Sequence, residues 1–317
     1  MNVWLNFLID SLAFGGTFIY GSTGEILTEK AGHLNLGIPG IMCMGGAGGC
    51  LVLNWVGKSN LPGFLIVILG ILGALAGAML CGLIYSFLTV TLRANQNVTG
   101  LALTTFGVNL CKVIMIKLDA TVYLVGPKML YRWPFADRTD SIQCLGVLFF
   151  LAVIVAVAAS WFLFRTKPGL HLRAVGENPA TADAVGINVT RYKYLATVIG
   201  SGISGLGGFY YIIDYMTSQE AYKSVEAFGW LSIALVIFAL WRPHMTILGS
   251  LVFGFLFSCS SFITNIDWIK VTMPMKPILK MLPFVVTIIV LIVSSIKDKR
   301  ENQPPASLGL SYFREER

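Results

Sequence analysis

Residues 145–164 read LGVLFFLAVIVAVAASWFLF, and no Asp, Glu, Lys or Arg interrupts them. A helix of about 20 apolar residues spans the hydrocarbon core of a bilayer. Uncharged runs also occupy residues 230–240 and 282–296. Of the 317 residues, 56% are hydrophobic and only 12% are charged, whereas about 25% are charged in a soluble domain. The sequence therefore predicts a chain built largely of membrane-crossing helices.

The alternation of apolar runs with charged or proline-rich breaks predicts an all-α fold, a polytopic transmembrane helix bundle. About nine spans are expected, with eight and ten as alternatives. They fall near residues 10–28, 38–56, 62–88, 97–117, 143–165, 193–213, 227–242, 245–264 and 280–297. The stretches 28–38 and 214–226 could each hold a re-entrant or broken helix. Residues 1–300 then form one domain, and we expect residues 301–317 to be a mobile cytoplasmic tail.

Small residues recur at four-residue spacing within the predicted spans, as in Gly45 and Gly49, and in Gly200, Ser204 and Gly208. This spacing places them on one face of a helix, where neighbouring backbones can approach closely. Tight helix packing is expected there, and it excludes no class of membrane protein.

The net charge of +7 comes from Lys and Arg that lie between the apolar runs and near their ends. This distribution fits the setting of topology and contact with lipid headgroups better than nucleic-acid binding. Placing the long polar connection 166–193 in the cytoplasm puts the N-terminus outside and the C-terminus inside. Of the 23 Lys and Arg, thirteen then face the cytoplasm, so the charge rule favours this orientation by a narrow margin.

Several patterns that would indicate catalysis or metal binding are incomplete. Gly57-Lys58-Ser59 resembles the end of a phosphate-binding loop, but Val52 stands where that loop needs a glycine. The three histidines are far apart and the cysteines form no C-x-x-C pair, so we expect no metal site. A set of nucleophile, base and metal ligands is also missing, and we expect a non-catalytic chain that binds no cofactor of its own.

The connection 170–192, LHLRAVGENPATADAVGINVTRY, predicts a short helix between two spans. Asn178 is a capping residue, Pro179 suits a first helical turn, and Gly186 stands where a helix ends. Ala182, Val185 and Ile187 could present an apolar knob to a groove in a partner protein. An ordinary surface loop is the alternative.

Three motifs, in the order of a known family, carry a specific resemblance. Residues 24–40, GEILTEKAGHLNLGIPG, resemble the N-terminal signature of permeases in ATP-binding-cassette importers, in the branch for branched-chain amino acids, simple sugars and nucleosides. Residues 97–103, NVTGLAL, and 229–236, GWLSIALV, followed by Trp241-Arg242-Pro243, are similar to its later signatures. The likeness covers about residues 20–260 and is nearest to the shorter of the paired nucleoside permeases. Pro39 stands where the family usually has an acidic residue, which weakens the substrate assignment.

The resemblance implies a permease subunit of the bacterial cytoplasmic membrane, forming a solute pathway with a second homologous permease. Separate ATPase subunits would bind ATP and Mg, and a substrate-binding lipoprotein would capture the solute. The connection 166–193 would then couple the permease to the ATPase. Its expected coupling residues are Glu177, Asn178, Pro179, Ala182, Asp183, Val185, Gly186 and Ile187.

Polar side chains within the spans are candidates for the pathway, because polar groups cannot face lipid without a large cost. The polar candidates are Glu25, Asn35, Asn97, Thr99 and Asn109, and the aromatic candidates for stacking a nucleobase are Phe106, Phe228 and Trp230. Hydrogen bonding between helices is the alternative for the polar set, and packing is the alternative for the aromatic set.

Nucleosides, a simple sugar and riboflavin all remain open as substrates. An ion-coupled secondary transporter is the main alternative class, although such proteins usually bury several carboxylates or a histidine at mid-membrane. A membrane enzyme ranks third.

Overall fold

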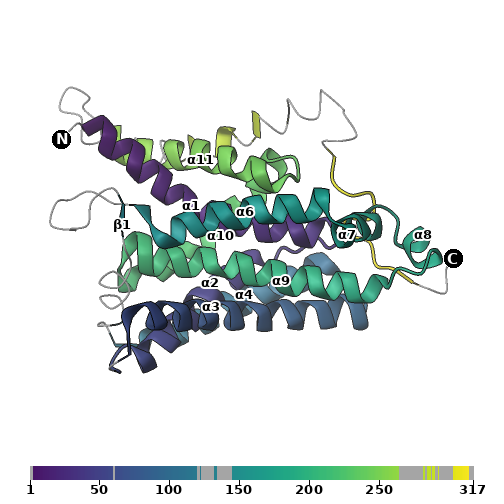
Figure 1. Ribbon diagram of the computed structural model, residues 1–317, viewed down its shortest axis with the longest axis horizontal. Helices are drawn as coiled ribbons and strands as arrows, with labels where there is room; N and C mark the ends of the chain where they lie inside the picture. The colour runs from purple at the N-terminus through teal and green to yellow at the C-terminus, as the bar shows by residue number, and fades with distance from the viewer. Residues whose placement is uncertain are drawn as a thin grey trace.

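The computed structural model describes residues 3–59, 61–119, 122, 132, 133, 145–263 and 303–313, with isolated positions between 281 and 292. Long helices lie side by side along the longest axis of the molecule (Figure 1). They are α1 (Val3–Glu29), α2 (Ile38–Val56), α3 (Gly63–Ser86), α4 (Gln96–Ile116), α6 (Val147–Arg165), α9 (Val189–Tyr210), α10 (Tyr222–Phe238) and α11 (Pro243–Ile263). Each predicted span up to 245–264 coincides with one of them, which confirms the all-α bundle. The predicted span 280–297 lies mostly outside the described residues.

Burial divides the membrane-scale helices into inner and outer members. Five stretches of the described chain are long and apolar enough to cross a membrane: Ile38–Val56, Gly63–Thr91, Gln96–Ile116, Val147–Arg165 and Val189–Met216. In the most apolar windows of the α2 and α9 stretches, 72% and 83% of the residues are buried, against 28% and 33% in the α3 and α6 stretches. The α2 and α9 helices therefore form the centre of the bundle, and α3 and α6 present apolar surface outward.

The connection between α6 and α9 holds two helices at one end of the bundle (Figure 1). They are α7 (Lys167–Glu177) and α8 (Pro179–Ala184). The sequence predicted only the second. The first begins after Thr166, whose hydroxyl accepts a hydrogen bond from the N–H of Gly169 at 3.1 Å, with a proline in its first turn. A capping residue followed closely by proline is a helix-start signal, so the sequence does carry a local cause for this helix.

The two stretches that could hold a re-entrant or broken helix each contain a break between helices. Residues 30–37 are turn and coil between α1 and α2. Near the other end of the bundle, α9 continues as the π-helix η2 (Tyr211–Met216), Thr217 takes a left-handed backbone with φ 48°, and the 3₁₀-helix η3 (Gln219–Ala221) leads into α10. A second π-helix, η1 (Phe87–Thr91), ends α3. The two-residue strands β1 (Arg132–Trp133) and β2 (Leu145–Gly146) pair antiparallel before α6.

The small residues mark the closest helix crossings. A Cβ added to Gly45 of α2 would lie 2.3 Å from the carbonyl oxygen of Gly205 in α9 and 2.4 Å from its Cα. One added to Gly208 would lie 1.9 Å from the carbonyl oxygen of Met42. Backbone therefore packs directly on backbone along the α2–α9 contact, as the four-residue spacing predicted.

Gly45→Ala should separate α2 from α9, because its methyl group would overlap backbone atoms that cannot rotate away. We expect a loss of about 1–3 kcal/mol in stability, measured as a lower melting temperature of the purified protein in detergent. Gly70→Ala is the matched control, because its methyl group would meet only side-chain atoms of Leu53 and Phe209 at 3.0 Å. Equal melting temperatures for the two variants would contradict the close crossing.

Candidate functional site

The irregular segment 30–37 is enclosed by the bundle, and side chains of the surrounding helices satisfy its backbone. Ala31, His33 and Asn35 are at most 1% exposed. Backbone that is neither helix nor strand is tolerated at membrane depth only where protein or a cavity supplies partners. Three such bonds are Leu34 N–H to Gln96 Oε1 at 2.8 Å, Tyr85 hydroxyl to the Leu34 carbonyl at 2.7 Å, and Thr104 hydroxyl to the Leu36 carbonyl at 2.7 Å.

The pathway candidates Glu25 and Asn35 both brace this segment. The backbone N–H of Asn35 donates to Glu25 Oε1 at 3.2 Å, and the N–H of Gly37 donates to Asn35 Oδ1 at 2.9 Å. Glu25 Oε2 and Asn35 Nδ2 have no hydrogen-bond partner among the described residues, and both side chains are 0% exposed. Glu25 Oε1 and Asn35 Oδ1 therefore hold the backbone in place, which favours a packing role over contact with solute for these two atoms.

Glu29 belongs to the same buried cluster, and it was not among the residues predicted from the sequence. It lies one turn after Glu25 on α1, is 3% exposed, and accepts a hydrogen bond from the indole N–H of Trp241. The four-residue spacing of the two glutamates in the signature segment was the available signal. The bond to Trp241 ties the end of α1 to the end of α10.

Helix α4 carries the exposed members of the candidate set. Asn97, Phe106 and Asn109 are exposed, whereas Thr99 is buried. Asn109 Nδ2 donates to the carbonyl of Thr105 at 2.8 Å. Other exposed residues of α4 are apolar, among them Val98, Leu101 and Val113. Asn109 therefore interrupts a largely apolar surface, and an amide that faces lipid is costly.

Helix α10 carries the remaining aromatic candidates in two different settings. Phe228 is 4% exposed and packs edge-on against Phe14 and Tyr211, with ring centroids 5.1 and 4.8 Å apart. Trp230 is partly exposed. Between them, a Cβ added to Gly229 would lie 2.4 Å from the Cα of Pro39. Phe228 is thus a packing residue in this structure, and Pro39 lies at the close contact between α2 and α10.

The predicted coupling helix forms as its capping signals indicated. Asn178 Oδ1 accepts the N–H of Thr181 at 2.9 Å, and Pro179 opens the helix. Gly186 follows with φ 88°, a left-handed backbone that strains residues with a Cβ.

Only part of the predicted apolar knob lies on the surface. Ala182 is 3% exposed and packs inward against Val175 and Val189, with Ile187 partly buried beside them. Val185 is 71% exposed. Grouping Ala182 with Val185 as one exposed surface was therefore wrong, because α8 turns Ala182 toward α7 and α9.

Some of the remaining coupling candidates are exposed, and two of them bind the C-terminal segment. Glu177, Asn178 and Gly186 are exposed. Glu177 Oε2 nonetheless accepts the N–H of Ala306 at 3.4 Å, and Asp183 Oδ2 accepts the hydroxyl of Tyr312 at 2.9 Å.

These two hydrogen bonds are part of a set of contacts made by residues 303–313, which the sequence led us to expect as mobile. The N–H of Ser307 donates to the carbonyl of Gly176 at 3.0 Å, and the N–H of Gly309 donates to that of Gly32 at 3.3 Å. Gln96 Nε2 donates to the carbonyl of Leu310 at 3.4 Å. Residues 303–313 thus connect α7 and α8 to the irregular segment 30–37. No local sequence pattern predicted these contacts.

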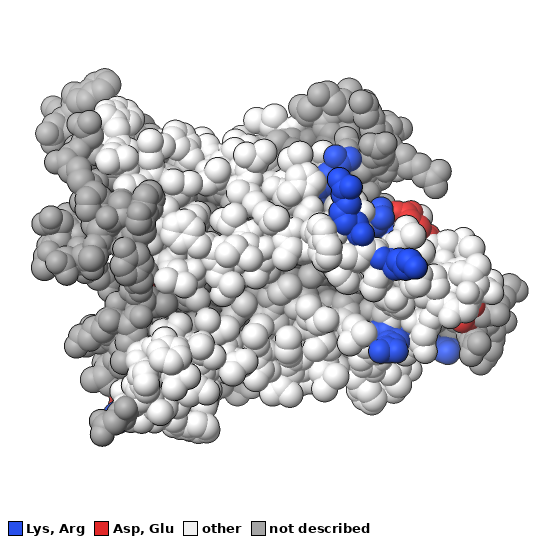
Figure 2. All heavy atoms as spheres, in the orientation of Figure 1, with Lys and Arg blue, Asp and Glu red and all other residues white. Residues whose placement is uncertain are grey.

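Basic side chains collect at this end of the bundle. Figure 2 shows Lys and Arg gathered near α7 and α8, while the sides of the described helices on the face shown are almost free of charge. Those at this end include Lys30, Arg93, Arg173, Arg191 and Arg242, which line neighbouring cavities. The same end carries every predicted coupling residue.

A family model and several curated proteins match most of this chain. The family model described as the permease component of the branched-chain amino acid transport system matches residues 7–291. The nucleoside ABC transporter permease protein NupC of Lactococcus lactis is 33% identical over 289 residues, covering 88% of this chain and 89% of its own. The guanosine ABC transporter permease protein NupQ of Bacillus subtilis is 30% identical over 270 residues, 79% and 80% of the two chains. The putative glucose ABC transporter permease protein TsgC13 of Haloferax volcanii is 32% identical over 244 residues, 74% and 70%.

The same substitution at two asparagines separates bracing from solute contact. Asn35→Leu should lower stability by about 1–3 kcal/mol, because it leaves the Gly37 N–H buried without an acceptor, while transport per assembled complex stays near the unsubstituted level. Asn109→Leu should leave the melting temperature unchanged and lower transport. Uptake normalised to assembled complex in proteoliposomes measures both effects. Loss of transport in an Asn35→Leu protein of unchanged stability would contradict the bracing role and support contact between Asn35 and the solute.

Proposed function

Because this chain belongs to the family of permease components of branched-chain amino acid transport systems, we propose that it serves an importer of nucleosides. It is an integral protein of the cell membrane, and members of this family are normally non-catalytic subunits of ATP-driven transporters. The observation that carries the substrate proposal is the 33% identity to NupC along 88% of this chain. The comparable identity to a putative glucose permease makes a simple sugar the second candidate.

The exposed amides of α4 support a shared solute route. Asn109 lies within the helix and is costly in hydrocarbon, whereas a water-filled path between two permease subunits would hydrate both it and Asn97 in the first turn. Phe106 lies exposed on the same helix and offers an aromatic face for a base or a sugar ring. We therefore place the route along α4, at the contact with a second homologous permease, with Trp230 of α10 as a further candidate.

The exposed part of the α7–α8 connection supports ATPase docking. Val185 projects an apolar side chain from a polar surface, which suits insertion into a groove of a partner. The basic residues gathered at this end favour a cytoplasmic position. A separate ATPase that binds ATP and Mg would therefore meet α8, and a substrate-binding lipoprotein would deliver solute at the opposite end.

Substrate identity can be tested with the assembled transporter in proteoliposomes, with its cognate permease, ATPase and lipoprotein. Labelled guanosine and uridine should accumulate only when ATP is supplied, and unlabelled nucleoside should compete. Glucose and riboflavin should neither accumulate nor compete. ATP-driven uptake of glucose without uptake of nucleosides would reject the nucleoside proposal and keep the sugar alternative.

Val185→Asp should uncouple transport without unfolding the permease, because a charge would be desolvated at the docked surface. Substrate-stimulated ATP hydrolysis and uptake should fall at least about tenfold, while the melting temperature of the isolated permease stays unchanged. Val185→Leu should retain coupling. Ala182→Asp should instead lower the melting temperature, since its side chain points into the protein. Normal ATPase stimulation by Val185→Asp would contradict docking at α8.

Orientation can be measured with single cysteines added to a cysteine-free background. Thr181→Cys, on α8, should react only with maleimides that enter the cytoplasm. Ser59→Cys, after α2 at the opposite end, should react with impermeant maleimides in intact cells. Reversed labelling would invert the topology and remove the coupling role of α8.

A further inference from the structure

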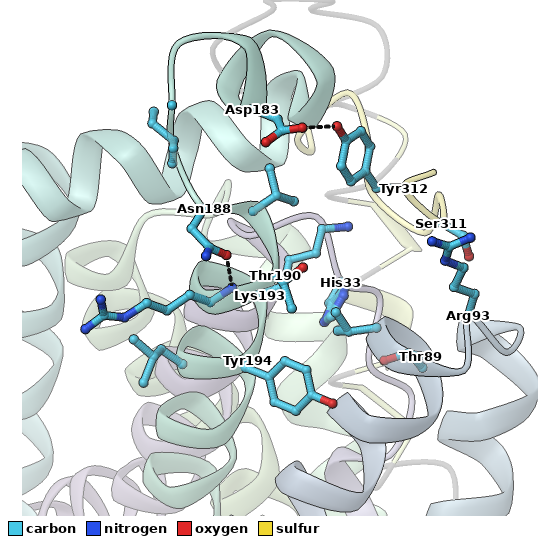
Figure 3. A pocket seen from close by; sticks show the side chains of 16 residues that line it. His33, Thr89, Arg93, Asp183, Asn188, Thr190, Lys193, Tyr194, Ser311 and Tyr312 are labelled. Carbon is cyan, nitrogen blue, oxygen red and sulfur yellow. Dashed lines mark hydrogen bonds between the residues drawn. The ribbon is translucent and has the colours of Figure 1, made fainter. Parts of the chain in front are cut away.

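A polar cavity of about 750 Å³ lies beside the coupling helix. Its wall comes from α8 and the α8–α9 connection, the first turns of α9, η1 and Arg93 after it, His33 of the segment 30–37 and the C-terminal segment, as the labelled side chains in Figure 3 show. Segments distant in sequence therefore enclose one space at the basic end of the bundle.

The cavity has an excess of positive charge. Arg93, Arg191 and Lys193 line it, against one carboxylate, Asp183, which already accepts the hydroxyl of Tyr312. The ion pairs found between described residues join other side chains, Lys58 with Asp119 and Lys223 with Glu220. Arg93 instead lies over the ring of Phe313, 4.8 Å from its centroid. The three basic side chains thus line the cavity without a carboxylate partner in the described chain.

Lys193 is the most informative of the three. The residue is only 3% exposed, and no hydrogen bond of its ammonium group is found among the described residues. The ammonium is not one of the fully enclosed unpaired atoms, since Lys193 lines the cavity. A largely buried ammonium without an acceptor or counter-charge is unfavourable, and an anion in the cavity would supply both.

The start of α9 contributes backbone N–H groups to the same wall. Asn188 Oδ1 already accepts the N–H of Arg191 at 2.9 Å, so the N–H groups left for a ligand are those of Val189 and Thr190, which open the helix and line the cavity. The first N–H groups of a helix have no acceptor within it, and together with the helix dipole they favour anions.

We propose that this cavity binds a phosphate group, held by Lys193, Arg93 and the first turn of α9. A phosphate carries several acceptor oxygens and up to two negative charges, so it can meet an ammonium, a guanidinium and backbone N–H groups together. The group belongs either to an anionic phospholipid headgroup or to a soluble phosphate. Because Asp183, Gly186 and Ile187 also line the cavity, the bound group lies against the predicted coupling residues.

The test uses the full-length permease purified with its partner subunits and stripped of lipid. Melting temperature is followed at constant ionic strength in chloride during titration with inorganic phosphate, short-chain phosphatidylglycerol or short-chain phosphatidylcholine. Phosphate or phosphatidylglycerol should raise the melting temperature with saturation, and phosphatidylcholine should not. Saturation by phosphate identifies a soluble ligand, and saturation by phosphatidylglycerol alone identifies a headgroup. No saturable shift with either would overturn the proposal.

Paired variants separate this site from general attraction to a basic surface. Lys193→Met and Arg93→Gln should each raise the half-saturating concentration about tenfold or more. Lys167→Met and Arg165→Gln remove the same charges at the same end but outside the cavity lining, and should change it less than twofold. Without ligand, the melting temperature of the Lys193→Met protein should be equal to or higher than that of the unsubstituted protein, because the substitution removes a largely buried charge without a partner. An equal rise in the half-saturating concentration for all four variants would overturn the site. If the Lys193→Met protein does not fold, the comparison of Arg93→Gln with the two control variants tests the site.

Discussion

The structure depends on satisfying the backbone of residues 30–37, which the bundle encloses. Each N–H or carbonyl left unpaired in this buried segment would cost about 1–3 kcal/mol. Glu25 of α1, Tyr85 of α3 and Gln96 of α4 supply partners. A polar loop thereby fixes the relative positions of three helices, which apolar packing alone specifies weakly in lipid because lipid tails are as apolar as the side chains. This explains why the signature segment is rich in Gly, Asn and Glu within an otherwise apolar chain.

Much of the architecture could be predicted because its causes are local. Span positions follow from uncharged runs, the α8 cap follows from Asn178 and Pro179, and close backbone packing at the glycine faces follows from their four-residue spacing. The pairing of α2 with α9 at these faces could not be predicted from that spacing. The orientation of side chains could not be predicted in the same way. Phe228 points inward because of a partner distant in sequence, Phe14, and Ala182 points inward because the turn between α7 and α8 brings it against Val175. The contacts of residues 303–313 could not be predicted either, because the composition of a segment does not show which distant residues will accept its hydrogen bonds.

The candidate site divides by burial into two physical roles. Buried members such as Asn35 have backbone partners and define shape. Exposed members such as Asn109 present polar atoms on the surface of a helix long and apolar enough to cross a membrane. Sequence alone could not separate these groups, because both contain the same residue types in apolar surroundings.

The hydrogen bond from Gly309 to Gly32 has a consequence for the order in which the protein matures. It joins residues separated by nearly the whole sequence, and closing so long a loop is entropically costly until the intervening helices are in place. During synthesis, the segment after α1 emerges and enters the membrane long before the residues that complete its pairing exist. The end of the molecule that holds α7 and α8 is consequently the last part to be completed, after the membrane-scale helices have assembled.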